Sequence, residues 1–193
     1  MKRDIILAGV GGQGILSIAA IIGTAAVQSG LHLKQAEVHG MSQRGGDVQS
    51  NLRLSDKEIA SDLIPRGKAD MIISVEPMES LRYLPMLAME GWVITNVKPY
   101  INIPNYPSIE KVMEEIETLP NHIAIDADTI AHDLGSVKSA NMVVLGAASP
   151  FLEIDFEKLE DAIRTIFGSK GEEVIQLNLD ALRAGRKFAK EHS

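Results

Sequence analysis

The 193-residue chain contains no cysteine, and this absence excludes three kinds of site. Without thiolates the chain can hold neither an iron–sulfur cluster ligated by cysteine nor a Cys-based zinc site, and it can form no disulfide. Any relay of electrons through clusters must therefore lie on another chain.

The chain also lacks a long hydrophobic run and an excess of basic residues. Its first apolar run extends for about five residues before glycines interrupt it, which is too short for a signal peptide, and no stretch approaches the roughly 20 apolar residues that span a bilayer. Lys and Arg number 19 against 26 Asp and Glu, so the formal net charge is −7. Such a surface repels the phosphates of nucleic acids and anionic membranes. We therefore expect a cytoplasmic protein with neither a nucleic-acid nor a membrane partner.

What the chain does contain is an alternation of short β-rich runs with longer segments of helical period. This alternation is typical of a parallel sheet covered by helices on both faces, and the length and 45% hydrophobic content suit one substantial core. The sequence thus predicts a single Rossmann-like, three-layer α/β domain over residues 1–193, with a mainly parallel sheet.

Strands are expected at residues 4–8, 34–38, 48–54, 69–75, 92–97 and 122–126, and helices at 15–29, 79–89, 109–117, 141–148, 155–167 and 172–191. The last helix is charged, so we expect it on the outside of the domain or against a partner. Prolines at positions 99, 104 and 107 predict an extended segment between the fifth strand and the following helix.

A glycine-rich loop, GVGGQG at residues 9–14, fits the pattern G-x-G-x-x-G directly after a predicted strand and directly before a helix. In a dinucleotide-binding loop, glycines let the backbone approach a pyrophosphate, and the helix N-terminus offers unpaired N–H groups. Glu37, at the end of the second predicted strand, lies where a ribose-binding acid could be. The motif alone indicates NAD or FAD, but the glycines could equally serve a tight turn and close helix–sheet packing with no nucleotide bound.

A second glycine-rich loop, EVHGMSQRGGD, covers residues 37–47 and should lie at the carboxyl edge of the sheet, where ligands of open α/β sheets bind. Arg44 offers a fork of donors for a phosphate or carboxylate, and the adjacent glycines would allow close approach. The alternative is a solvated turn with Arg44 in a surface ion pair. The candidate residues of this loop are His39, Ser42, Gln43, Arg44, Gly45 and Gly46.

Three weaker patterns have simpler explanations. General-base catalysis by His39 is conceivable because its ordinary pKa is near neutrality, but a structural role is the expected one. Asp126, Asp128 and His132 could suggest a metal site, whereas Asp128 at a helix N-cap explains the same residues. Asn141 is likewise expected to cap an apolar helix.

Four motifs, in one order, carry a resemblance to a known family: GVGGQGI, EVHGMSQRGGDVQSNLR, AIDADTIAHDLG and NMVVLGA. Together they resemble the gamma subunit or domain of 2-oxoacid:ferredoxin oxidoreductases, over most of the chain. The SQRGG segment and the small, cysteine-free chain are most similar to the small subunit of indolepyruvate:ferredoxin oxidoreductase.

The resemblance implies a complex that oxidatively decarboxylates an arylpyruvate on thiamine diphosphate, passes electrons through iron–sulfur clusters to ferredoxin and releases the acyl group on coenzyme A. Thiamine diphosphate, magnesium and the clusters would belong to a large partner subunit, so this chain alone would bind none of them and would be inactive. In keeping with this, the chain has no G-D-G motif of the kind that family members use to hold the metal ion of thiamine diphosphate. This subunit would pack beside the active site and help to receive coenzyme A.

The candidate cofactor-binding residues are Gly9, Gly11, Gly12, Gln13, Gly14, Glu37, His39, Ser42, Gln43, Arg44, Gly45 and Gly46, and no catalytic or metal-ligating residue is assigned. Two alternatives of other classes stay open: a free-standing NAD- or FAD-dependent Rossmann dehydrogenase, and a nucleotide-sensing module. The first needs a substrate domain and the second an output domain, and the chain supplies neither easily.

Overall fold

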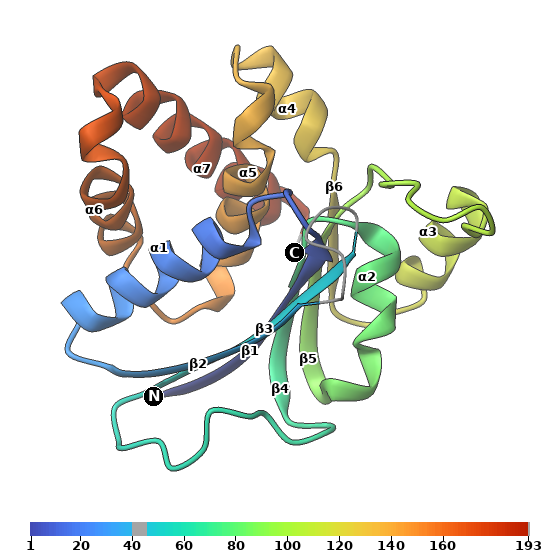
Figure 1. Ribbon diagram of the computed structural model, residues 1–193, viewed down its shortest axis with the longest axis horizontal. Helices are drawn as coiled ribbons and strands as arrows, with labels where there is room; N and C mark the ends of the chain where they lie inside the picture. Colours follow the sequence, from blue (N-terminus) through green and yellow to red (C-terminus); the bar gives the residue numbers. More distant parts are fainter. Residues whose placement is uncertain (40–45, 193) are drawn as a thin grey trace.

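The computed structural model describes residues 1–39 and 46–192 and shows one six-stranded sheet in the order β2-β3-β1-β4-β5-β6 (Figure 1). Pairing is parallel between β1 and β4, β4 and β5, and β5 and β6, whereas β3 runs antiparallel to both of its neighbours. Five of the six strands therefore share one direction, which confirms the predicted mainly parallel α/β fold. The strands are β1 (Lys2–Val10), β2 (His32–His39), β3 (Asp47–Ser55), β4 (Ala69–Ser74), β5 (Leu87–Asn96) and β6 (His122–Ile125).

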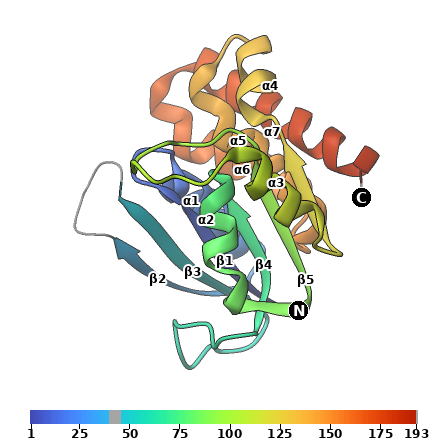
Figure 2. The ribbon, with the colours of Figure 1, turned by 90° about the vertical axis from the view of Figure 1, so that its right-hand side faces the viewer.

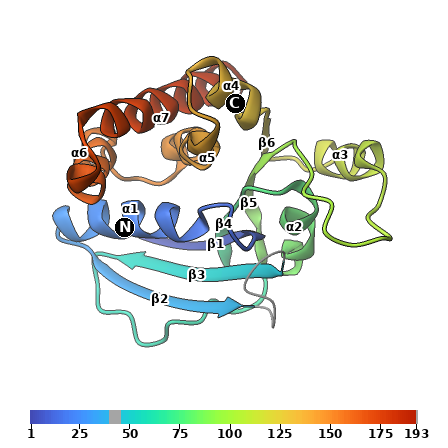
Figure 3. The ribbon, with the colours of Figure 1, turned by 45° about the horizontal axis from the view of Figure 1, so that its top comes forward.

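Helices cover both faces of the sheet, as Figure 3 shows. They are α1 (Ile15–Gln28), α2 (Pro77–Arg82), α3 (Ile109–Glu117), α4 (Ala127–Asp133), α5 (Ala140–Ala148), α6 (Phe156–Phe167) and α7 (Glu172–His192). Short 3-10 turns lie at Leu84–Met86, Val137–Ser139, Ser149–Phe151 and Gly168–Lys170. In the part of the chain that the structure describes, no helix is both long enough and apolar enough to cross a membrane.

The central strands are apolar on both faces because both faces are covered. Successive side chains of a strand point to opposite sides, and on β1 Ile5 and Leu7 join a large core with α1, α5, α6 and α7, whereas Ile6 joins a smaller core on the other face. Figure 2 looks onto that second face, where α2 and α3 lie in front of β4 and β5. This burial explains the continuous apolar run that predicts β1.

Helix α7 packs directly on the backbone of α5. A Cβ atom on Gly185 would lie 1.9 Å from the carbonyl oxygen of Val143, and one on Gly146 would lie 2.0 Å from that of Leu182. Glycine is therefore required on both helices at their contact. The charged helix expected on the outside thus has one face buried in the domain, where Leu179 contributes to the core.

The predicted helix over residues 79–89 is wrong at both ends. Helix α2 begins at Pro77 and ends at Arg82, and β5 already begins at Leu87. Pro85 lies inside the predicted range, and its ring and missing N–H prevent an α-helix from continuing through it. The leucine and methionine residues that follow join the sheet instead.

Two predicted helix caps are also wrong. Asp126, not Asp128, is the N-cap of α4, and its carboxylate accepts the backbone N–H of Thr129 at 3.0 Å. Asn141 lies inside α5, whose N-cap is Ser139. The side chain of Asn141 is instead engaged by the glycine loop.

Candidate functional site

The two predicted glycine-rich loops meet at the carboxyl edge of the sheet. Strand β1 leads into the glycine loop at residues 9–14, and β3 begins beside it after the second loop. The backbone N–H of Gly11 donates to the carbonyl of Gly46 at 2.9 Å, so one hydrogen bond joins the first loop to the end of the second. The same edge collects the segments that follow β4, β5 and β6, as expected for a ligand-binding edge.

Three glycines of the first loop differ in the space that a Cβ atom would have at each position. A Cβ atom on Gly9 would lie 2.5 Å from Cγ2 of Val75, so Gly9 is required for packing. Gly14 has a left-handed φ of 81°, and a Cβ atom there would lie 2.4 Å from Nδ2 of Asn141. Gly12 also has a positive φ, 100°, but a Cβ atom there would meet nothing within 4 Å. Of these three, Gly12 is thus the one that leaves open space beside the backbone.

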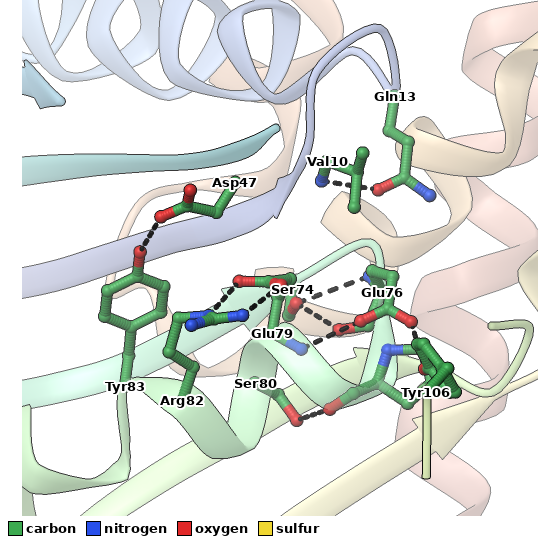
Figure 4. A network of polar contacts seen from close by, with 11 residues as sticks. Val10, Gln13, Asp47, Ser74, Glu76, Glu79, Ser80, Arg82, Tyr83 and Tyr106 are labelled. Carbon is green, nitrogen blue, oxygen red and sulfur yellow. Dashed lines mark hydrogen bonds and ion pairs between the residues drawn. The ribbon is translucent and has the colours of Figure 1, made fainter. Parts of the chain in front are cut away.

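The side chain of Gln13 holds the loop in shape. Its Oε1 accepts the backbone N–H of Val10 at 2.8 Å, and its Nε2 donates to the carbonyl of Val75 at 3.5 Å, as the close-up in Figure 4 shows in part. Across from it, Nδ2 of Asn141 donates to the carbonyl of Gly14 at 3.1 Å. Gln13 therefore braces the loop against the segment that follows β4, and it also lines the cavity described below, so its prediction as a ligand contact stays a prediction.

A cavity of about 800 Å³ opens beside the glycine loop. Gly12 and Gly14 line it at the start of α1, Asn141 lines it at the start of α5, and Lys138 and Lys170 add two cationic side chains. Helix N-termini carry partial positive charge and unpaired N–H groups, so they favour anions. The volume is in the range of pockets that hold nucleotide-sized ligands. The cavity therefore suits an extended anionic ligand.

Asp128 is the one acidic residue among the described residues that line this cavity. Its carboxylate accepts a hydrogen bond from Nδ2 of Asn96 at 2.7 Å, and Oδ1 of Asn96 accepts the backbone N–H of Ala127 at 3.1 Å. Asn96 therefore connects the ends of β5 and β6, and Asp128 is committed to that link.

A second polar network, not predicted from the sequence, lies around α2 (Figure 4). Glu76 is fully buried two residues after β4, and its carboxylate caps α2 by accepting the backbone N–H of Glu79 at 2.8 Å. The same carboxylate accepts the backbone N–H of Tyr100 at 3.2 Å and the hydroxyl of Tyr106. Burial and this contact with Glu76 raise the pKa of Tyr106. The available signal was the Glu-Pro pair after an apolar strand, because an acid before a proline is typical of a helix start.

The network continues on the far side of α2. Burial raises the pKa of the Glu79 carboxyl, although Arg82 opposes the shift through an ion pair at 2.7 Å. The hydroxyl of Tyr83 donates to the carboxylate of Asp47 at 3.4 Å. Burial and this neighbouring charge raise the pKa of Tyr83 to about 12. The network thus reaches from β3 to the segment after β5.

Glu37 lies across the sheet from the glycine loop, so its prediction as the ribose-binding acid of that loop stays a prediction. It is on β2, and β3 lies between β2 and β1, which separates Glu37 from the loop by two strand spacings, or about 10 Å. Its carboxylate accepts a hydrogen bond from Gln35 at 2.6 Å. His39 is the last residue of β2, but its side chain and the candidate residues Ser42, Gln43, Arg44 and Gly45 lie outside the described residues.

The residues of the possible metal site face different partners. Asp126 caps α4 and forms an ion pair with Lys98 at 3.2 Å, Asp128 is bound by Asn96, and His132 is exposed beside Asp133. Among residues 1–39 and 46–192, no three histidine or acidic side chains are grouped to hold a metal ion.

Comparison with known proteins agrees with this architecture. Residues 4–188 match the family model "Pyruvate ferredoxin/flavodoxin oxidoreductase", and the chain belongs to this family. The chain is 38% identical over 194 residues to the indolepyruvate oxidoreductase subunit IorB of Archaeoglobus fulgidus, a match that covers 96% of this chain and 94% of that protein. The resemblance drawn from the four motifs is thereby confirmed, and nothing in these similarities favours a free-standing NAD- or FAD-dependent dehydrogenase.

Two solved structures share the fold. The 2-oxoglutarate:ferredoxin oxidoreductase from Magnetococcus marinus, with 2-oxoglutarate, coenzyme A and succinyl-CoA bound, has a TM-score of 0.78 at 24% identity over 98% of this chain and 31% of that one. The gamma subunit of keto/oxoacid ferredoxin oxidoreductase from Geobacter sulfurreducens PCA has a TM-score of 0.71 at 23% identity over 98% and 99% of the two chains. The fold thus occurs both as a separate subunit and as part of a longer chain.

Proposed function

We propose that this chain is the subunit without thiamine or clusters in a complex that oxidatively decarboxylates indolepyruvate, or another arylpyruvate, to an acyl-CoA with ferredoxin as electron acceptor. The observation that carries the proposal is the 38% identity to an indolepyruvate oxidoreductase subunit along nearly the whole length of both chains. The match covers 96% of this chain, so the aligned region extends over the glycine loop, the second loop, α1 and α5.

The residues present support a division of the chemistry between two subunits. The large partner subunit would hold thiamine diphosphate, magnesium and the iron–sulfur clusters, because this chain has no cysteine and no G-D-G motif. When bound there, thiamine diphosphate supplies the decarboxylation chemistry. The residues of this chain would bind and orient the second substrate, coenzyme A, and exclude water from the meeting point of the two subunits.

Coenzyme A suits the cavity beside the glycine loop. Its nucleotide end carries several phosphates, and the cavity combines the N-termini of α1 and α5 with Lys138 and Lys170. The open space beside Gly12 would let a phosphate approach the backbone. Arg44, in the second loop, would add a charge-assisted contact of the same kind.

The proposal is tested by recovering the tagged chain from its native host. The expected result is co-purification of a large, brown, cluster-containing subunit, together with arylpyruvate-dependent reduction of ferredoxin or a viologen dye by the recovered complex. A tagged chain recovered without such a subunit would contradict the proposal. Co-purification of a dehydrogenase that reduces NAD would assign the glycine loop to the alternative class.

A further inference from the structure

In the segment between β5 and α3, residues 97–108, exposed apolar side chains lie on a stretch that carries no charged residue beyond Lys98. Tyr100, Ile101 and Ile103 are all exposed, and Ile101 is 72% exposed. From Pro99 to Ser108 the sequence PYINIPNYPS contains no charged residue, in a chain of which 23% is charged. Single exposed apolar residues are ordinary, but three within four positions of an uncharged segment indicate a surface that another protein covers.

A buried carboxylate fixes this segment in its exposed conformation. Glu76 accepts hydrogen bonds from the backbone N–H of Tyr100 and from the hydroxyl of Tyr106, so both sides of the apolar stretch are fastened to one point of the domain. Glu76 itself is held by the cap contact with Glu79 and is fully buried. A segment that is already ordered loses less conformational entropy when a partner binds it.

Exposed apolar side chains are concentrated at the edge that carries the candidate site. Nine large apolar side chains are exposed among the described residues. Three of them, Val27, Leu63 and Met89, lie on segments at the opposite edge of the sheet. The other six lie on segments at the carboxyl edge: Leu16, Val38, Tyr100, Ile101, Ile103 and Val137. Val137 also lines the cavity, so one of these six side chains lies at the candidate site itself.

We propose that residues 97–108 form a docking site for the large thiamine- and cluster-carrying subunit, with Ile101 and Ile103 as its apolar anchors. This rests on the proposed function, because coenzyme A held at the carboxyl edge can react only if the partner's active site faces that edge. A second copy of this chain bound there would cover the edge that the partner must reach. The Magnetococcus marinus chain, in which this fold makes up 31% of the length, joins the same fold to further parts of one chain.

The test measures the affinity of the full chain for the purified large subunit. Ile101→Asp should weaken binding about 10- to 100-fold, the loss typical when a central apolar anchor is removed. The matched control is Met89→Asp, because Met89 is 93% exposed but lies at the start of β5, on the opposite edge. Met89→Asp should leave the affinity within about threefold, and since both side chains are exposed, both variants should fold. Equal affinities for Ile101→Asp and the unsubstituted chain would overturn the docking site.

Tyr106→Phe tests the role of the carboxylate contact separately, because it removes one hydrogen bond and leaves the apolar anchors in place. We expect the amide of Tyr100 to exchange faster with solvent and the affinity to fall, by less than with Ile101→Asp. Faster exchange with unchanged affinity would show that ordering of the segment does not contribute to docking and would remove Glu76 and Tyr106 from the proposal.

Further outcomes distinguish the large subunit from a second copy of this chain as the occupant, and failure of the docking site from failure of the proposed function. Sedimentation of the isolated chain that revealed a dimer broken by Ile101→Asp would assign the surface to a second copy and overturn the docking site. If the unsubstituted chain binds the large subunit and Ile101→Asp binds equally well, the docking site fails and the proposed function stands. If the unsubstituted chain does not bind the large subunit at all, both fail.

Discussion

Gly14 and Asn141 form the contact that joins the glycine loop to α5, and replacing them singly and together tests how the loop is held. Gly14 is the left-handed N-cap of α1, and its carbonyl accepts a hydrogen bond from Nδ2 of Asn141 at 3.1 Å. A Cβ atom on Gly14 would lie 2.4 Å from that same Nδ2. Gly14→Ala therefore both strains the backbone and displaces the amide.

The magnitude follows from these two contributions. The left-handed conformation costs a residue with a Cβ atom about 1–2 kcal/mol, and a lost hydrogen bond costs about 1 kcal/mol. Gly14→Ala should thus lower the free energy of unfolding by about 2–3 kcal/mol, and Asn141→Ala by about 1 kcal/mol. In the double variant the hydrogen bond is lost only once, so the cost stays at about 2–3 kcal/mol. The cycle should show a coupling of about 1 kcal/mol.

The assay is urea unfolding of the four proteins, with free energies from linear extrapolation. Gly12→Ala is the matched control, because Gly12 also has a positive φ but a Cβ atom there meets nothing within 4 Å. Gly12→Ala should cost about 1–2 kcal/mol and show no coupling to Asn141→Ala. Additive costs for Gly14→Ala and Asn141→Ala would refute the contact as the link between the loop and α5.

Three further predictions concern the second loop, the helix contact and the network around α2. Arg44→Ala should raise the KM for coenzyme A in the reconstituted complex by about tenfold or more, because a charge-assisted hydrogen bond contributes about 1.5–3 kcal/mol. The control Arg66→Ala, at an exposed arginine, should leave that KM unchanged. An unchanged KM for Arg44→Ala would make Arg44 part of a solvated turn, and failed assembly would make it an interface residue. Gly185→Ala should lower the free energy of unfolding by about 1–3 kcal/mol through overpacking against α5. Gly168→Ala, where a Cβ atom meets nothing, should change it by less than about 0.5 kcal/mol. Similar effects of the two variants in urea unfolding would count against the close helix contact. Burial raises the pKa of Tyr83 from 10.0 to about 12, so the contribution of the neutral phenol to stability is complete below pH 10 and is lost as the pH rises through 12. Tyr83→Phe should abolish this loss. Phenolate absorbance from Tyr83 that already develops near pH 10 would contradict the prediction.

Much of the fold was predictable because its signals are local. Strands β1 and β4 are short apolar runs, and α3 begins and ends where its helical period predicts, at Ile109 and Glu117. The antiparallel direction of β3 and its place between β2 and β1 were not predicted, because strand order depends on pairing between distant segments. That order is also why Glu37 lies about 10 Å from the loop that it was expected to serve.

The candidate site was predictable in its location and less so in its residues. The motifs placed both glycine-rich loops at the carboxyl edge, and the hydrogen bond from Gly11 to Gly46 joins them there. Sequence patterns could not distinguish Gly9, which is required for packing, from Gly12, which leaves open space, because the difference depends on Val75, at the end of the neighbouring strand β4. Glu76 was missed because a single acid before a proline predicts a helix cap and gives no sign of the two tyrosine contacts.

The most direct test of the central claim is reconstitution of activity from purified subunits. Indolepyruvate-dependent reduction of a viologen dye, with coenzyme A present, would be measured for this chain alone, for the large subunit alone and for the two mixed. We predict no activity from the chain alone and formation of acyl-CoA with dye reduction in the mixture, at a rate well above that of the large subunit alone. Turnover by the chain alone, or a rate for the large subunit that the chain does not change, would contradict the claim that it is a working part of a 2-oxoacid:ferredoxin oxidoreductase.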